Sequence, residues 1–319
     1  MKQSIRWSIF VALSAAVIGS ASFAAEVKWP EEPVTIVVAA NAGGGTDVQA
    51  RLVAEYFRKH TGQDMVVEKQ RAGSGTVAYE QVRNAEPDGY TLLYYHNSLF
   101  VSYYSGIYPH EPLKNFVPLG KFTESNGNAI CVPKDAPYST LDELVAAAKA
   151  KPDTIVAGIQ VGGFPEYLIR LLEKAAGCTF KCVDAGNASN RLTSLLGGYI
   201  GVACLDPKQA EKYYESGDIK VLAICSPERV VAFPKWKSTG EYGYPSVNIP
   251  NGQFLYGPIG IKPELAAKMN EVFAKIGADP EYRAATQKMG RIPESLNLED
   301  TYKASKAQDD TIAAIVGKK

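Results

Sequence analysis

The chain of 319 residues is 46% apolar and 21% charged, a globular composition that argues against disorder throughout. Its length suffices for two domains of ordinary size. The 34 basic and 34 acidic residues balance, so charge gives no reason to expect nucleic acid or an anionic membrane surface as a partner.

The first 24 residues have the features of a cleavable export signal. Lys2 and Arg6 form a basic start, residues 9–18 form an apolar stretch, and Ser22 and Ala24 fit a small-x-small cleavage site. The apolar stretch is too short and interrupted for a membrane anchor, and no cysteine follows it for lipid attachment. We therefore expect export to the periplasm and a mature chain with a formal charge of −2 once Lys2 and Arg6 are removed.

The next part of the chain alternates short β-branched runs with amphipathic stretches. Strands are expected at residues 34–40, 65–68 and 90–95, and helices at 46–60 and 76–84. Gly62 is a suitable stop for the first of these helices. The βαβαβ order favours a parallel sheet with helices against it.

Residues 116–133 lack helical periodicity and are expected to form an extended crossing into a second domain. That domain starts with a helix at 140–149, where Thr140 and Glu143 have capping-box spacing. Strands follow at 154–158, 180–183, 200–205 and 220–225, with helices at 165–176, 191–196 and 207–214. This order predicts another mostly parallel sheet.

The end of the chain is expected to return to the first domain, with a strand at 254–261 and helices at 263–276 and 298–316. The first domain then comprises residues 25–123 and 227–319, and the second comprises residues 124–226. Two crossings between the domains predict a hinged pair.

The cysteines and histidines indicate neither a metal nor a cofactor. Five cysteines in an oxidising compartment could form up to two disulfides and leave one thiol unpaired, but their spacing does not assign the pairs. Cys178 and Cys182 are not spaced as C-x-x-C, and none of the three histidines stands near them. We expect no metal site and no cofactor.

A glycine-rich loop between the first strand and the first helix is the main candidate for binding. Its residues are Asn41, Ala42, Gly43, Gly44, Gly45, Thr46 and Asp47. Backbone N–H groups at a helix start favour an anion, and glycines let a ligand approach the backbone. The alternative is a tight turn with Thr46 as the helix cap, whereas a nucleotide loop would need a lysine that is missing here.

A second loop, Gly73, Ser74 and Gly75, lies at the end of the next strand and should reach the same sheet edge. Tyr95 and His96 end a third strand there. In the second domain, comparable strand ends carry further candidates, whose alternative role is to form turns or helix caps. These candidates are Gly162, Gly163, Phe164, Asn187 and Asp206.

Catalytic patterns are missing from the sequence. There is no G-x-S-x-G motif, no nucleophile stands near the histidines, and no carboxylate pair marks a glycine-rich loop. The sequence therefore favours a protein that binds an anion over an enzyme.

The glycine loops and several short motifs resemble those of the substrate-binding proteins of tripartite tricarboxylate transporters, the Bug or TctC family. The matching segments are Trp29-Pro30, 33–38, 43–47, Ala50-Arg51, Gly62-Gln63, 66–68, 73–75, 87–93, 195–198, Tyr256-Gly257 and 279–281. The resemblance therefore extends over essentially the whole mature chain.

This resemblance implies a periplasmic, type II-like Venus-flytrap protein with two α/β domains that close on a carboxylate held mainly by backbone N–H groups. It also implies transient binding to the integral-membrane permease subunits of such a transporter, and we expect a monomer. The loops at Asn41-Ala42, 163–166 and 184–186 depart from the usual family pattern, which leaves the carboxylate open. Phe164, Tyr95 and Tyr256 suit an aromatic carboxylate, while an aliphatic di- or tricarboxylate and a role in presenting ligand to a membrane sensor kinase are alternatives.

Overall fold

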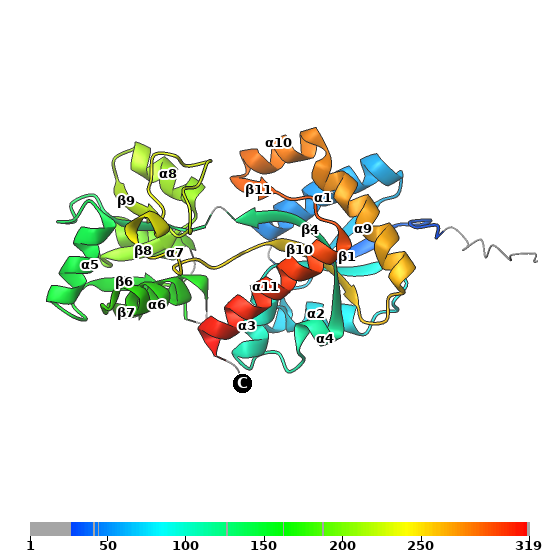
Figure 1. Cartoon of the computed structure of the whole chain (residues 1–319), viewed down its shortest axis with the longest axis horizontal. Helices are drawn as coiled ribbons and strands as arrows, with labels where there is room; N and C mark the ends of the chain where they lie inside the picture. Colours follow the sequence, from blue (N-terminus) through cyan, green and yellow to red (C-terminus); the bar gives the residue numbers. More distant parts are fainter. Residues whose placement is uncertain are drawn as a thin grey trace, which may run out of the picture.

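The computed structural model describes residues 27–40, 42–43, 45–125, 127–161, 163–186 and 188–317, so the predicted export signal lies outside the described residues. Two β-sheets form the centres of two lobes (Figure 1). The first sheet has the strand order β11-β4-β10-β3-β1-β2. Its strands are β1 (Val34–Val38), β2 (Met65–Lys69), β3 (Thr91–Tyr95), β4 (Phe116–Ser125), β10 (Gln253–Pro258) and β11 (Arg291–Pro293).

Helices cover both faces of this first sheet. On one face α1 (Gly45–Thr61) and α9 (Pro263–Ala278) bury apolar side chains against β1, β3 and β4. On the other face α2 (Thr76–Arg83), α3 (Ser98–Tyr104) and α11 (Leu298–Val316) pack against the sheet. The short η1 (Ala72–Gly75) and α4 (Pro112–Asn115), together with α10 (Pro280–Lys288), complete the lobe.

The second sheet has the order β7-β6-β8-β5-β9. Its strands are β5 (Ala129–Pro133), β6 (Val156–Ile159), β7 (Lys181–Asp184), β8 (Val202–Leu205) and β9 (Ile219–Ile224). Its helices are α5 (Leu141–Ala150), α6 (Phe164–Ala176), α7 (Ala188–Leu196) and α8 (Pro207–Glu215). The predicted capping box is present, with Thr140 accepting the N–H of Glu143 and the Glu143 side chain accepting the N–H of Thr140.

Two segments cross between the sheets, one from β4 to β5 and one from β9 to β10, and the second contains the short helix η2 (Gly240–Tyr242). The lobes also share apolar contacts, because Phe100 of α3 and Ile312 of α11 belong to the same buried cluster as Leu168 and Ile169 of α6. For the exact boundaries we propose that one domain comprises residues 25–123 and 227–319 and that the other comprises residues 124–226.

The α/β fold is confirmed, but both sheets are mixed rather than mostly parallel. In the first sheet β2, β1 and β3 are parallel, whereas β10, β4 and β11 are antiparallel to their neighbours. In the second, β7, β6 and β8 are parallel, and β5 is antiparallel to β8 and β9. A helical crossover makes consecutive strands parallel, whereas β5 and β10 enter their sheets directly from the other lobe.

Candidate functional site

The loop before α1 is braced by the side chain of Asp47. The Gly43 N–H donates to Asp47 Oδ2 at 2.8 Å, and the Asp47 carboxylate, 2% exposed, pairs with Arg51 at 3.2 Å. The Gly43 N–H, followed by Arg51, holds the pKa of Asp47 below its usual value despite burial. Gly43 has a φ of +72°, which a residue with a side chain rarely adopts. Asn41 and Gly44 lie outside the described residues.

This loop leads directly into the N-terminus of α1, whose first residues are Gly45 and Thr46. A Cβ added to Gly45 would meet no atom within 4 Å, so the space beside the helix start is open. Ala42 and Gly43 are exposed next to it. The free N–H groups of a helix start carry a partial positive charge, so this position suits an anion.

The second loop, after β2, contains three consecutive residues with left-handed backbone. Gly73, Ser74 and Gly75 have φ values of +61°, +59° and +97°. Such a conformation is strained for Ser74, and strained residues are found preferentially at functional sites. Since β1 and β2 are parallel neighbours, this loop and the loop before α1 lie at the same edge of the sheet.

His96 follows β3 at this edge and touches the other lobe. Its ring lies 6.2 Å from the ring of Phe164, the first residue of α6, and 4.3 Å from Tyr95, on which it stacks. The N–H of Ser98 donates to His96 Nδ1 at 3.3 Å. Burial lowers the pKa of His96 to about 4, so the ring is neutral at physiological pH. Two residues predicted to bind ligand from opposite lobes are thus in contact.

The other predicted residues of the second lobe have mainly structural contacts. Gly163 is the N-cap of α6 and donates its N–H to Gln160 O at 2.9 Å. Asp206 caps α8, accepting the N–H groups of Lys208 at 2.9 Å and Gln209 at 3.2 Å. These contacts are those of a turn and a cap, so the role of both residues as ligand contacts stays a prediction. Gly162 and Asn187 lie outside the described residues.

The aromatic residues proposed for an aromatic ligand are not equally available. Tyr256 is 0% exposed, and its hydroxyl pairs with Ser305 Oγ at 3.2 Å in the core between the sheet and α11. It therefore does not line a ligand pocket, and that expectation was wrong, because alternate positions of the central strand β10 face a helix rather than solvent. Tyr95 is 8% exposed and packs beside Tyr79, at 5.6 Å between ring centroids.

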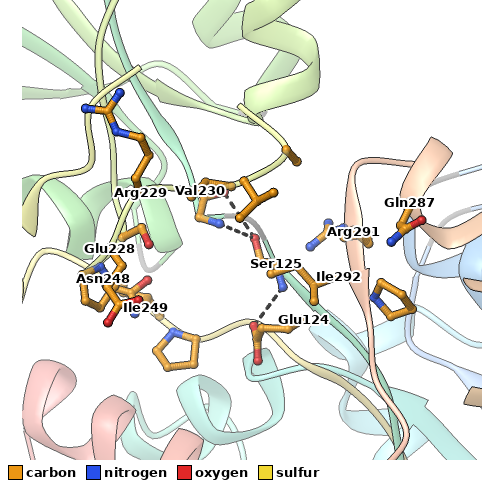
Figure 2. A pocket seen from close by; sticks show the side chains of 17 residues that line it. Glu124, Ser125, Glu228, Arg229, Val230, Asn248, Ile249, Gln287, Arg291 and Ile292 are labelled. Carbon is orange, nitrogen blue, oxygen red and sulfur yellow. Dashed lines mark hydrogen bonds between the residues drawn. The ribbon is translucent and has the colours of Figure 1, made fainter. Parts of the chain in front are cut away.

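A cavity of about 750 Å³ lies between the lobes beside the crossing segments (Figure 2). It is lined by the end of β4, by residues 226–232 and 248–250 of the second crossing, and by Gln287 and residues 291–293. None of the residues predicted from the sequence is among the described residues that line it. Arg291 points into it, and its Nη1 is buried without a hydrogen-bond partner among the described residues (Figure 2).

The sequence does not single out Arg291, because the segment Met289-Gly290-Arg291 contains no recognisable motif. The available signal was Gly290 after a helical pattern, which marks a helix end. Gly290 has a φ of +74° and turns the chain from α10 into β11. A Cβ on Gly290 would lie 3.4 Å from Lys208 Cβ, so this turn also approaches the second lobe.

All five cysteines lie in the described part of the chain, and none of them forms a disulfide. The described residues contain no group of three or more histidine, cysteine or acidic side chains that could hold a metal ion. Within the same residues, no helix has the length and apolar character needed to cross a membrane.

Comparison with known proteins agrees with this fold and identifies the family. The model of the family described as the tripartite tricarboxylate transporter family receptor matches residues 49–318. A UPF0065 protein of Agrobacterium vitis is 29% identical over 273 residues, which cover 84% of this chain and 78% of the relative.

Solved structures of similar proteins include a TctC solute-binding protein from Polaromonas without ligand. It is 25% identical, with a TM-score of 0.78 over 91% of this chain and 99% of that chain. An R. palustris protein solved with adipate is 22% identical and has a TM-score of 0.75 over 91% of this chain and 98% of that chain. The family resemblance seen in the sequence is confirmed: the chain belongs to the tripartite tricarboxylate transporter receptor family.

Proposed function

We propose that this chain is an exported, monomeric solute-binding protein that captures a small organic carboxylate in the periplasm. It then delivers the carboxylate to the integral-membrane permease of a tripartite tricarboxylate transporter. The family description as a receptor of that transporter supports this role. Adipate in a solved protein of the same fold makes a carboxylate the first class of ligand to test.

The observation that carries the proposal is the glycine loop at the N-terminus of α1. The Asp47 carboxylate, already held by Gly43 and Arg51, fixes the loop and leaves the exposed helix start beside Gly45 open. A helix start with free N–H groups binds a carboxylate without a charged side chain. The loop at Gly73–Gly75 lies at the same edge and completes the proposed cradle.

The second lobe closes this cradle in our proposal. His96, just after the end of β3, contacts Phe164, at the start of α6 in the other lobe. A ligand bound beside His96 therefore touches both lobes. Ligand that contacts both lobes favours the closed arrangement, because it gains contacts there that the open arrangement lacks. The neutral ring of His96 can donate or accept a hydrogen bond without repelling or attracting the anion.

The second candidate role is presentation of the ligand to a membrane sensor kinase, which uses the same closed surface. Uptake of the ligand by a deletion strain separates the two roles, since only a transport protein is required for uptake. A periplasmic enzyme is the remaining alternative. Intact carboxylate recovered from denatured protein after long incubation, with no product, is the result we expect.

A thermal-shift screen tests the proposal directly. It uses mono-, di-, tri- and aromatic carboxylates of roughly three to eight carbons, because a ligand that binds only the folded protein raises its melting temperature. At about 100 times its Kd, a ligand stabilises the folded protein by about 2.7 kcal/mol. If no carboxylate raises the melting temperature while neutral solutes do, the proposed ligand class is wrong.

A further inference from the structure

Arg291 is a cation without a partner at its buried end. Nη1 of its guanidinium has no hydrogen-bond partner among the described residues and is shielded from solvent. An unpaired, buried donor of a charged group is costly, and a carboxylate is the group that best satisfies it, because guanidinium binds carboxylate through two parallel hydrogen bonds.

The other charged groups at the cavity are already engaged or exposed. Glu124 accepts the N–H of Asn251 at 2.8 Å through Oε1 and pairs with Lys121 at 2.9 Å through Oε2. Arg229 forms an ion pair with Glu241, and Glu228 is exposed. Arg291 is therefore the lining cation, within the described part of the chain, that is best placed to pair with an anion held in the cavity.

The strand register places the Arg291 side chain on the face of the sheet that α1 covers. β11 pairs with β4 so that Arg291 lies opposite Ser125 and Pro293 lies opposite Thr123. The hydroxyl of Thr123 donates to Oε1 of Gln49, in α1, at 3.0 Å, which fixes the face of Thr123. Residues opposite each other, and residues two apart along a strand, share a face.

The same register places Arg291 level with the start of α1. β4 runs in the same direction as β1, and α1 runs in the opposite direction. Moving along β4 from Thr123 to Ser125 therefore leads in the same direction as moving back along α1 from Gln49 to Gly45. The two steps are about 7 Å and about 6 Å long. The guanidinium and the helix start therefore lie at one corner of the lobe.

Electrostatics agree with this placement. The pKa of His96 is lowered first by burial, and the positive charge of Arg291 lowers it further. Arg291 is thus close enough to influence the residue at the interlobe contact, on the same side of the sheet as the glycine loop. The cavity extends from Arg291 to the second crossing segment, where Val230 and Ile249 supply apolar walls.

We propose that Arg291 binds a second carboxylate of the ligand, while the first carboxylate is held at the start of α1, so that the protein selects dicarboxylates over monocarboxylates. This inference rests on the proposed function and defines its ligand class. The side-chain charge of Arg291 adds to binding by backbone N–H groups, which the sequence alone indicated.

Isothermal titration calorimetry with matched ligand pairs tests the inference. The probes are succinate, adipate and terephthalate, each compared with its monoamide, which has nearly the same shape and one carboxylate fewer. We expect wild-type protein to bind at least one dicarboxylate about 10- to 100-fold more tightly than its monoamide. Arg291→Gln should abolish this preference and change the affinity for the monoamide by less than about threefold.

Two further variants separate binding from structure. Lys288→Gln removes an exposed positive charge from the end of α10 and should leave the preference unchanged. Arg291→Lys keeps the charge but loses the paired hydrogen bonds, so part of the preference should remain. Melting temperatures without ligand show whether each variant is folded.

The outcomes distinguish the two proposals. If folded Arg291→Gln keeps the preference, or if wild-type protein binds monoamides as tightly as dicarboxylates, the role of Arg291 is wrong and the proposed function stands. If wild-type protein binds none of the carboxylates, the proposed function fails, and the inference fails with it.

Discussion

Replacing Gly43 by alanine tests whether the loop before α1 holds the ligand, and Gly62→Ala is its matched control. Gly43 and Gly62 have φ values of +72° and +76°, and a Cβ on either would meet no atom within 4 Å. Gly62 follows the other end of α1, away from the loop. The two substitutions therefore introduce the same backbone strain at opposite ends of one helix.

Alanine in the left-handed conformation costs about 1–2 kcal/mol. Both variants should therefore lose similar stability, a fall in melting temperature of about 2–8 °C for a protein of this size. At Gly43 the loop can relieve the strain by leaving its conformation, which breaks the bond to Asp47. The fraction of molecules whose loop has the binding conformation then falls by the factor that corresponds to the strain energy. This lowers the affinity for carboxylate by at most about 5- to 30-fold.

The assay combines thermal unfolding without ligand with calorimetric titration of the carboxylate that stabilises the wild-type protein most. Gly62→Ala should bind that carboxylate as the wild type does. Equal melting temperatures with equal affinities in the two variants would refute the assignment of the glycine loop as the ligand cradle.

Three further predictions follow from single side chains. The ionised Asp47 carboxylate stabilises the fold above pH 3.8, the usual pKa of the group, and this contribution is lost as the pH falls through the lowered pKa. The stability of Asp47→Asn, measured by urea unfolding, should therefore vary less with pH in this acidic range than that of the wild type. His96 has a pKa of about 4 in the folded protein, so the stability of the fold should decrease as the pH falls from about 6.5, the usual value, toward 4. His96→Gln should remove this loss of stability. The ligand affinity of the wild-type protein should stay flat between about pH 6.5 and 8, because the His96 ring is neutral there. Cys131, Cys204 and Cys225 are shielded from solvent, and burial raises the pKa of Cys131. All three thiols should therefore resist alkylation in the folded protein and react in denaturant, as read by mass spectrometry.

The sequence predicted the parts of the structure that depend on neighbours along the chain. The helix 298–316 was found with its expected bounds, the Thr140 capping box is formed, and the strands β1, β3 and β9 lie within two residues of their predicted limits. These features follow from periodicity, capping and turn residues, which act over a few positions. The glycine loops were placed correctly between strands and helices for the same reason.

The elements α3, α4, α10 and β11 were missed. Of these, α4 and β11 have only 4 and 3 residues, too few to carry a periodic signal. The mixed order of the sheets was also missed, because which strands pair is decided between segments far apart in the chain. The same limit applies to side chains, since Tyr256 is covered by α11, which lies far from it along the chain.

Tertiary structure alone decided which side chains could meet a ligand. The sequence showed that Asp47 follows a glycine loop, but only the folded loop showed that its carboxylate is occupied by Gly43 and Arg51. Arg291 has no motif around it, and pairing of β11 with β4 brings it to the start of α1. Local sequence predicted the glycine loop that we propose as the backbone cradle. The charge proposed beside it depends on the pairing of β11 with β4, which no local pattern encodes.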